Sequence, residues 1–239
     1  NPGINKIIIL IINFLIMTKL LKLSNVNLNY NIDNKSINIL KNISFEIDYK
    51  ETIWIVGESG CGKTSLIMLI GGLEQISSGK IFFKDLEVSS KSEDEISEIR
   101  RKDIGIVFQS FYLIPNYTAL ENVSLALEIN KLDNPIKKAK EILDRFGLSN
   151  RFNNLPSQLS GGEQQRVAIA RSVVMKPELI LADEPTGNLD SENTETISQL
   201  LFNYVKDENA SLIMVTHDNN LANLTKRKIS IKDGIINEN

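Results

Sequence analysis

GESGCGKT, residues 57–64, decides the fold of this chain, because it matches the phosphate-binding loop pattern G-x-x-x-x-G-K-[ST] at every fixed position. An apolar run at residues 53–56 precedes it and predicts a buried strand, and residues 65–70 continue as the start of an apolar helix. A strand, loop and helix in this order aim backbone N–H groups and the positive end of the helix dipole at one point. The alternative is a chance glycine-rich turn, which the flanking strand and helix disfavour.

The residues of this loop have distinct expected roles. Lys63 should reach the β- and γ-phosphates of a nucleoside triphosphate, and the Thr64 hydroxyl should bind Mg²⁺. The glycines allow a tight turn and the close approach of a phosphate. The other nucleotide-binding candidates in this stretch are Gly57, Glu58, Ser59, Gly60, Cys61, Gly62 and Ser65.

Composition limits the classes of protein that this chain can belong to. It has 239 residues, of which 42% are hydrophobic, and this suits one large domain with room for a smaller subdomain. The net charge of −3 indicates no basic surface, so we exclude a nucleic-acid partner. Cys61 is the single cysteine, so no internal disulfide can form, as is usual in a reducing cytosol. We interpret Cys61 as a tolerated small residue in preference to a redox switch.

The first residues of the chain do not have the sequence pattern expected of a globular domain. Residues 7–16 are almost entirely apolar, but the run is shorter than the roughly 20 residues that span a bilayer, and no small-residue cleavage site follows. We predict that residues 1–16 are a non-native or disordered extension and that the domain comprises residues 17–239, beginning at Met17. The alternative is a short anchor at a membrane surface, or a signal segment.

An antiparallel β segment is expected before the phosphate-binding loop. Residues 19–30 alternate loosely and predict a strand, and residues 37–47 predict one or two more. Tyr30 ends the first of these strands. An aromatic ring there could stack on an adenine ring, or it could be an ordinary strand tyrosine, and the spacing alone leaves both readings open.

Gln109 stands at the end of another predicted strand. Ser92 and Glu95 form a capping box that opens a charged helix, and residues 104–108 then predict a buried strand. A glutamine in this position can coordinate Mg²⁺ or the attacking water and can transmit movement. The alternative is an ordinary polar residue at a strand end.

Residues from about 110 to 160 are expected to form a helical subdomain inserted into the α/β core. A capping box predicts a helix over residues 118–130, and an Asn-Pro start with a closing glycine predicts another over residues 134–147. The loop at residues 111–116 is unusually apolar and aromatic. Either it packs under the helical subdomain or a membrane partner covers it, and we favour a role in both.

LSGGEQQR, residues 159–166, is the second informative stretch. Ser160 is an N-cap with Glu163 three residues later, and Gly161 and Gly162 expose N–H groups at the start of the helix. A helix N-terminus of this kind is an anion site. The sequence therefore predicts a second phosphate-binding point, far along the chain from the first.

Acidic residues follow a short apolar strand at residues 179–182. Asp183 at its carboxyl end suits Mg²⁺ coordination through water, and Glu184 can polarise the attacking water. The alternative is a pair of solvated strand-end acids. A further buried strand ends at His217, the single histidine, where ligands bind in open α/β sheets.

GESGCGKT, LSGGEQQR and LILADEP, together with Gln109, NLD and His217, occur in the order found in ATP-binding cassette ATPases. The chain resembles this family over nearly its whole length, and LSGGEQQR is the family's own signature. The resemblance implies an α/β P-loop NTPase core with an antiparallel β subdomain and an inserted helical subdomain. It also implies two cassettes that face each other head to tail, with each ATP between the P-loop of one and the signature of the other.

Site residues carry over from this resemblance position by position. Glu184 would be the general base, Tyr30 the adenine-stacking aromatic, and Gln109 the residue that senses the transporter. The catalytic residues would be Lys63, Gln109, Glu184 and His217. The residues at the metal would be Thr64, Gln109 and Asp183. Outside the P-loop, the nucleotide-binding residues would be Tyr30, Ser160, Gly161, Gly162, Glu163 and Asp190.

FQSFYLIPNYTALENV and LADEPTGNLD further resemble the subgroup of lipoprotein-releasing and macrolide-exporter ATPases, with the cell-division ATPase nearby. This implies an ATP-hydrolysing subunit that uses Mg²⁺, pairs with a second ATPase subunit and binds transmembrane permease subunits from the cytoplasmic face of the cell membrane. The alternative is an ATPase that signals through a membrane partner without transport. A soluble P-loop kinase has no use for LSGGEQQR.

Overall fold

The computed structural model describes residues 19–32, 35–187, 189–216, 225 and 227–238. The extension predicted at residues 1–16 and the predicted catalytic His217 lie outside these ranges.

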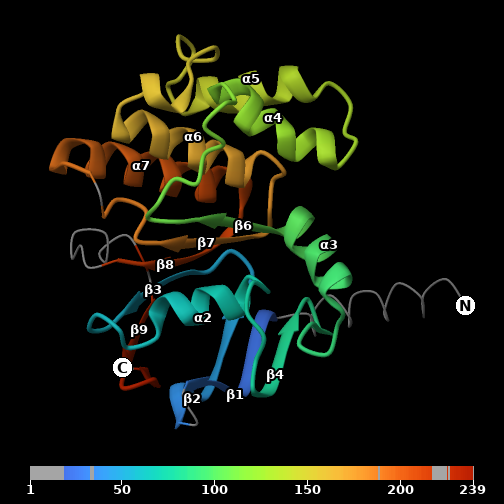
Figure 1. Cartoon of the computed structure of the whole chain (residues 1–239), viewed down its shortest axis with the longest axis vertical. Helices are drawn as coiled ribbons and strands as arrows, with labels where there is room; N and C mark the ends of the chain where they lie inside the picture. Colours follow the sequence, from blue (N-terminus) through green and yellow to red (C-terminus); the bar gives the residue numbers. More distant parts are fainter. Residues whose placement is uncertain (1–18, 33–34, 188, 217–224, 226, 239) are drawn as a thin grey trace, which may run out of the picture.

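The α/β core is a six-stranded sheet in the order β10-β9-β3-β8-β7-β6 (Figure 1). Strands β7 and β8 are buried on both faces, as expected for parallel strands covered on both sides. Strands β9, β3, β8, β7 and β6 run parallel, and β10 pairs antiparallel with β9 in a terminal hairpin. The strands are β3 (Thr52–Val56), β6 (Ile104–Val107), β7 (Leu179–Asp183), β8 (Ser211–Val215), β9 (Arg227–Lys232) and β10 (Ile235–Glu238).

A second, antiparallel sheet is ordered β2-β1-β4-β5. Residues 37–47 belong to one long strand, β2 (Lys35–Asp48), which pairs with β1 (Lys19–Ile32). Strand β4 (Ser78–Phe83), from beyond the P-loop, joins the other side of β1, and β5 (Leu86–Glu87) follows it.

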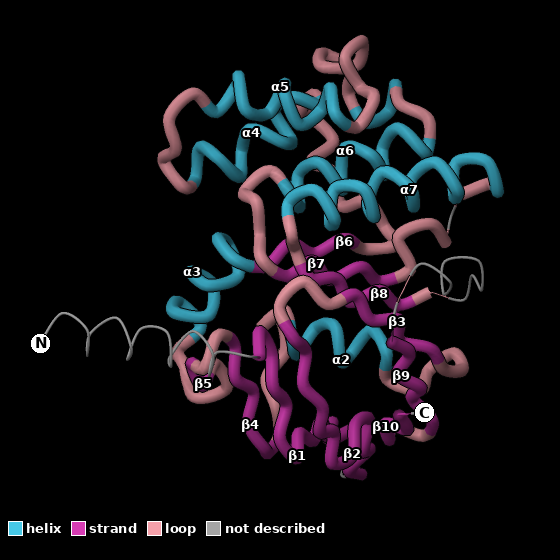
Figure 2. The backbone as a smooth tube through the Cα atoms, turned by 180° about the vertical axis from the view of Figure 1, so that it is seen from behind, coloured by secondary structure: helices cyan, strands magenta, loops and turns pink. Residues whose placement is uncertain are grey.

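Helix α2 (Lys63–Ile70) lies between the two sheets (Figures 1 and 2). Its apolar residues join one core cluster with β1, β2 and β4 and with one face of the six-stranded sheet. Ile213 and Leu181 point into this cluster, whereas their strand neighbours Leu212 and Ala182 belong to a second cluster on the opposite face. The alternation of β side chains thus gives the central sheet two apolar faces.

Helices α6 (Gly161–Val173) and α7 (Ser191–Glu208) lie over that opposite face, and α4 (Ala119–Ile129) and α5 (Pro135–Arg145) pack on α6 as a further layer (Figure 1). The predicted capping boxes of α4 and α6 are present, at Thr118 with Glu121 and at Ser160 with Glu163. Helix α3 (Glu93–Asp103) begins at the capping box predicted at Ser92 and leads into β6, and a short 3-10 turn (Pro156–Gln158) precedes α6. Among the described residues, no helix is long and apolar enough to cross a bilayer.

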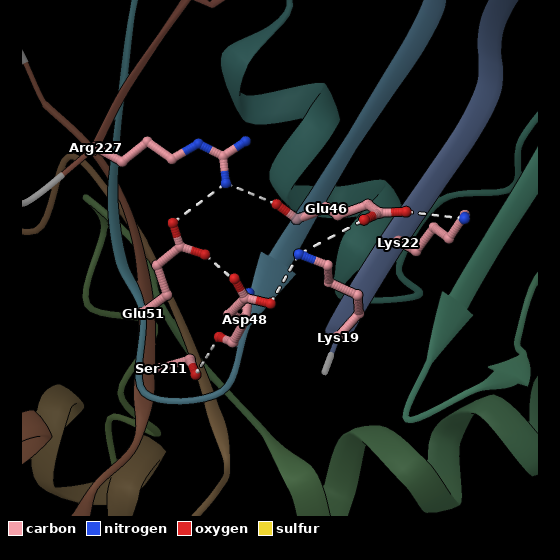
Figure 3. A network of polar contacts seen from close by, with 7 residues as sticks. All are labelled: Lys19, Lys22, Glu46, Asp48, Glu51, Ser211 and Arg227. Atoms are coloured by element: carbon pink, nitrogen blue, oxygen red, sulfur yellow. Dashed lines mark hydrogen bonds and ion pairs between the residues drawn. The ribbon is translucent and has the colours of Figure 1, made fainter. Parts of the chain in front are cut away.

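A polar network joins the two sheets at the amino ends of the parallel strands (Figure 3). Arg227, the first residue of β9, donates to the carbonyl of Glu46 at 2.8 Å and pairs with the Glu51 carboxylate at 3.2 Å. Lys19 of β1 pairs with Asp48 at 2.9 Å. Because these contacts stand at the amino ends, the carboxyl ends of the strands stay available for a ligand.

Asn122 of α4 organises the loop that follows Gln109. Its side chain is fully buried, and its Oδ1 accepts the N–H of Ile114 at 2.8 Å. Its Nδ2 donates to the carbonyls of Ile114 at 3.2 Å, Tyr117 at 2.9 Å and Thr118 at 3.1 Å. One amide therefore binds four backbone groups of this segment, and for the Ile114 N–H and the Tyr117 carbonyl it is the hydrogen-bond partner that the structure gives.

We expect Asn122→Leu to lower the free energy of unfolding by about 2–4 kcal/mol, because a similar volume would be kept while the Ile114 N–H and the Tyr117 carbonyl lose their side-chain partner. Denaturant unfolding followed by circular dichroism measures the loss. The control is Asn153→Leu at an exposed position, which should be close to neutral. Equal stability of the two variants would contradict the role given to Asn122.

Candidate functional site

A cleft of about 570 Å³ opens at the carboxyl ends of β3, β7 and β8. This is the edge at which ligands bind in open α/β sheets. Its lining combines the P-loop with residues from four other segments: Ser59, Gly60, Gly62, Lys63, Thr64, Ser65, Gln109, Asp183, Glu184, Thr186, Gly187, Thr194, Val215 and Thr216. The structure thus brings together Lys63, Thr64, Gln109, Asp183 and Glu184, as predicted for an NTPase centre.

The P-loop turns back over its own lysine. Lys63 is the first residue of α2, and its Nζ donates to the carbonyls of Gly57 and Glu58, each at 2.8 Å. Only 7% of Lys63 is exposed, so its charge is held in place at the floor of the cleft. Gly57 and Glu58 act here as hydrogen-bond acceptors for the lysine and do not line the cleft.

Gly62, which caps α2, explains why the loop needs a glycine at that point. Its φ of 103° lies in the left-handed region, where side chains are strained. A Cβ on this residue would also stand 2.8 Å from the Leu40 side chain of β2. The loop therefore packs tightly against the antiparallel sheet. This contact fixes the direction of the helix N-terminus.

Asp183 ends β7 beside Thr64. The carboxylate is only 7% exposed, and burial raises its pKa, whereas a hydrogen bond with Thr64 and the charge of Lys63 act in the opposite direction. Its buried Oδ1 accepts no hydrogen bond from any residue that the structure describes. A buried carboxylate oxygen that accepts no hydrogen bond and lies next to a hydroxyl is suited to binding a Mg²⁺ ion or one of the ion's water ligands.

The described residues hold no cluster of three or more His, Cys, Asp and Glu side chains that could bind a metal by itself. Thr64 and Asp183 could therefore supply only part of a coordination shell. This is the usual situation for Mg²⁺ at nucleotide sites, where phosphate oxygens and water provide the remaining ligands.

Glu184 has an unusual backbone conformation. Its φ is 48°, in the left-handed region that non-glycine residues rarely adopt, and its N–H donates to the carbonyl of Val215 at 2.9 Å. The bend turns the chain away from β7 and leaves Glu184 on the cleft wall. Strain of this kind persists where the surrounding structure holds it, and such positions are often functional.

Gln109 reaches the same wall from β6. A Cβ on Gly187 would stand 2.9 Å from the Gln109 side-chain Nε2, so the backbone at Gly187 leaves space for that amide. The loop after Gln109 is held by α6, because Arg171 donates to the carbonyls of Phe111 at 3.0 Å and Tyr112 at 2.7 Å.

The second anion site predicted from the sequence corresponds to the N-terminus of α6, which lies away from this cleft, and anion binding there stays a prediction. Ser160 Oγ accepts the N–H of Glu163 at 3.2 Å, and the Glu163 carboxylate accepts the N–H of Ser160 at 2.8 Å. Those hydrogen bonds and the Arg151 guanidinium, at 2.7 Å, hold the pKa of Glu163 below its usual value. Ser160 and Gly161 are exposed, and neither they nor Gly162 line the P-loop cleft.

Three other predicted residues also lie outside the cleft lining. The Tyr30 hydroxyl donates to Glu74 at 2.8 Å, and the ring is 37% exposed. Cys61 is buried within the core cluster beneath the loop. Asp190 caps α7 by accepting the N–H of Asn193 at 2.9 Å, and Asn193 stands against Gly162.

Sequence reasoning missed several cleft residues: Thr186, Gly187, Thr194, Val215 and Thr216. Thr186 and Gly187 could have been included, since they follow Glu184 in the same polar turn. Thr194 lies on α7, and nothing in its sequence neighbourhood connects it with the P-loop.

Comparisons with known proteins agree with this geometry. A model of the ABC transporter family matches residues 40–187, more than half of the chain. A lipoprotein-releasing system ATP-binding protein LolD from Treponema denticola is 45% identical over 202 residues, 84% of this chain and 89% of the relative. LolD from Myxococcus xanthus is 41% identical over 221 residues, 92% of this chain and 99% of the relative.

Solved structures confirm the predicted fold class. The ATP-binding cassette MJ0796, in a dimeric post-hydrolysis state with ADP and Pi, is 40% identical, and the two folds agree with a TM-score of 0.85 over 91% of this chain and 98% of that one. The family match, the relatives and the cleft geometry lead to one conclusion: the chain belongs to the ABC transporter family and is an ATP-hydrolysing cassette.

Proposed function

We propose that this chain is the ATPase subunit of a lipoprotein-releasing transporter, working as a pair of copies bound to transmembrane subunits at the inner face of the cell membrane. The convergence of Lys63, Thr64, Asp183, Glu184 and Gln109 on one cleft carries the ATPase assignment. The transported class rests on the relatives named LolD, which are similar over most of both chains.

Each residue of the cleft has a definite task in this proposal. Lys63 and the N–H groups of the P-loop bind the phosphates, and Thr64 and Asp183 hold Mg²⁺, which neutralises phosphate charge when bound. Glu184 orients the attacking water and accepts its proton, and Gln109 positions that water from the same wall. His217, which lies outside the described residues, is assigned to the γ-phosphate, and Tyr30 to the adenine ring.

A pair of copies is needed because the signature lies outside the P-loop cleft of its own chain. Ser160 and Gly161 expose a capped helix N-terminus with its positive dipole end, a good partner for a γ-phosphate. We infer that the Ser160, Gly161 and Gly162 of one copy, oriented by Glu163 and adjoining Asp190, close over the ATP of the other. The related cassette MJ0796 is dimeric in two solved structures.

Residues 110–160 act in this proposal as a helical subdomain that transmits movement between a membrane subunit and the cleft. Tyr112 is 67% exposed and has a left-handed φ of 47°, whereas Leu113 next to it packs on the helical core. Arg171 of α6 donates hydrogen bonds to backbone carbonyls of the same loop. A helix of a transmembrane subunit seated on Tyr112 would therefore press on a loop connected both to Gln109 and to α6.

Lys63→Ala should abolish nucleotide binding, because it removes the charge at the cleft floor. Titration with a fluorescent ATP analogue is expected to show a dissociation constant raised by about 100-fold or more. The control, Lys232→Ala on β9, removes an exposed lysine outside the cleft lining and should bind normally. An unchanged dissociation constant in Lys63→Ala would overturn the assignment of the cleft.

Glu184→Gln should leave ATP binding intact and slow hydrolysis by about 10²–10⁴-fold, because the amide cannot accept the proton of the water. With chemistry blocked, ATP should hold two copies together, and analytical ultracentrifugation would detect the dimer. Glu178→Gln, just before β7, is a matched control that should turn over normally. Near-normal turnover in Glu184→Gln would remove Glu184 from the role of base.

Tyr112→Ala should weaken binding to the transmembrane subunits by about 30-fold, as expected for an aromatic side chain that the partner buries on binding. Basal ATPase activity should stay unchanged. Co-purification from cells that express both subunits measures binding. The control is Tyr117→Ala, a tyrosine of the same segment that is 39% exposed. If basal activity falls with binding, or if neither changes, Tyr112 is not a docking residue.

A further inference from the structure

Trp54, the single tryptophan of the chain, lies in β3 just before the P-loop. Its neighbours Ile53 and Ile55 point into the core around α2, so Trp54 faces the opposite side of the sheet. In the ladder it stands beside Met214 of β8 and Lys228 of β9. Only 5% of the residue is exposed, so its indole N–H needs a partner inside the protein.

That partner is the main chain of Thr216. The indole Nε1 donates to the Thr216 carbonyl at 3.0 Å, in a buried hydrogen bond. The last β3–β8 pair joins Ile55 to Val215, so Thr216 lies one residue beyond the ladder. The tryptophan reaches along the sheet to a carbonyl two residues past its own ladder partner, a diagonal that a long aromatic side chain can cover.

Thr216 belongs to the cleft. It is 2% exposed and lines the wall together with Val215, and the next residue in the sequence is His217. The indole hydrogen bond therefore connects the strand that feeds the P-loop with the point at which the chain leaves β8 at the nucleotide site. The Lys228 Nζ lies over the indole ring, 4.9 Å from its centroid.

We propose that Trp54 is a positioning residue for ATP hydrolysis: its indole N–H fixes the Thr216 peptide at the wall of the cleft. The proposal rests on the cleft being the ATP site. Trp54 does not line the cleft, and the hydrogen bonds of Lys63 do not involve it. Loss of the indole hydrogen bond should therefore reduce turnover and leave ATP affinity almost unchanged.

Because the chain has a single tryptophan, one experiment can replace the indole N–H at position 54 and leave every other residue unchanged. Expression with 3-benzothienylalanine in place of tryptophan substitutes sulfur for the N–H at position 54 alone and keeps the size of the ring system. We expect kcat to fall about tenfold, the effect of one hydrogen bond, with KM for ATP within about twofold and only a small fall in the unfolding midpoint, because one buried hydrogen bond is lost. Trp54→Phe should lower kcat in the same way.

Lys228→Met is the matched control, because it removes the cation beside the ring and leaves the N–H in place; its kcat should equal that of the unaltered chain. Wild-type kcat in the benzothienyl protein would overturn the proposal. A kcat equally reduced in Lys228→Met would also overturn it, because packing of the ring would then be responsible.

Amide hydrogen exchange separates this proposal from the ATPase assignment. In the benzothienyl protein the peptide that contains Thr216 should exchange about tenfold faster, and P-loop peptides should not change. Unchanged exchange at Thr216 would overturn the role of Trp54 whatever the activity. An unaltered chain that hydrolyses no ATP would overturn the proposed function, and the exchange result would still decide on Trp54.

Discussion

One constraint governs the fold: the buried parallel strand β3 must end in the P-loop, and the P-loop must keep its N–H groups free to bind phosphate. The Lys63 ammonium, bonded to two carbonyls of that loop, holds the turn closed, and Gly62 supplies the left-handed backbone that the turn requires. Because β7 and β8 run parallel to β3, Asp183 and Thr216 reach the same edge of the sheet. The parallel pairing of β3, β7 and β8 therefore places the cleft at this edge of the sheet.

Local signals in the sequence predicted most of the elements. The capping boxes at Ser92, Thr118 and Ser160 marked three helix starts, since each joins a side-chain acceptor to a backbone donor within four residues. The all-apolar strands before Asp183 and before the P-loop were equally clear, because burial on both faces removes the polar alternation. Such features depend only on neighbours in the chain.

Features that depend on distant pairing were not predictable. Nothing in residues 78–83 indicates that β4 crosses over to pair with β1, and Thr194 joins the cleft only through the packing of α7. The hydrogen bond between Trp54 and Thr216 likewise joins residues that are 162 positions apart in the sequence. Tyr30 bonds to Glu74 and lies outside the cleft lining, so its place beside an adenine ring stays a prediction.

The central claim is that each ATP site is divided between two copies, and a mixing experiment tests it most directly. One chain carries Lys63→Ala and the other Gly161→Asp, which the fold should accept because a Cβ on Gly161 meets only the Leu189 side chain, at 3.6 Å. A mixed pair then retains one intact site, built from the P-loop of the second chain and the signature of the first. Mixing should restore ATPase activity that neither chain has alone, whereas a mixture that stays inactive would contradict a site divided between two copies.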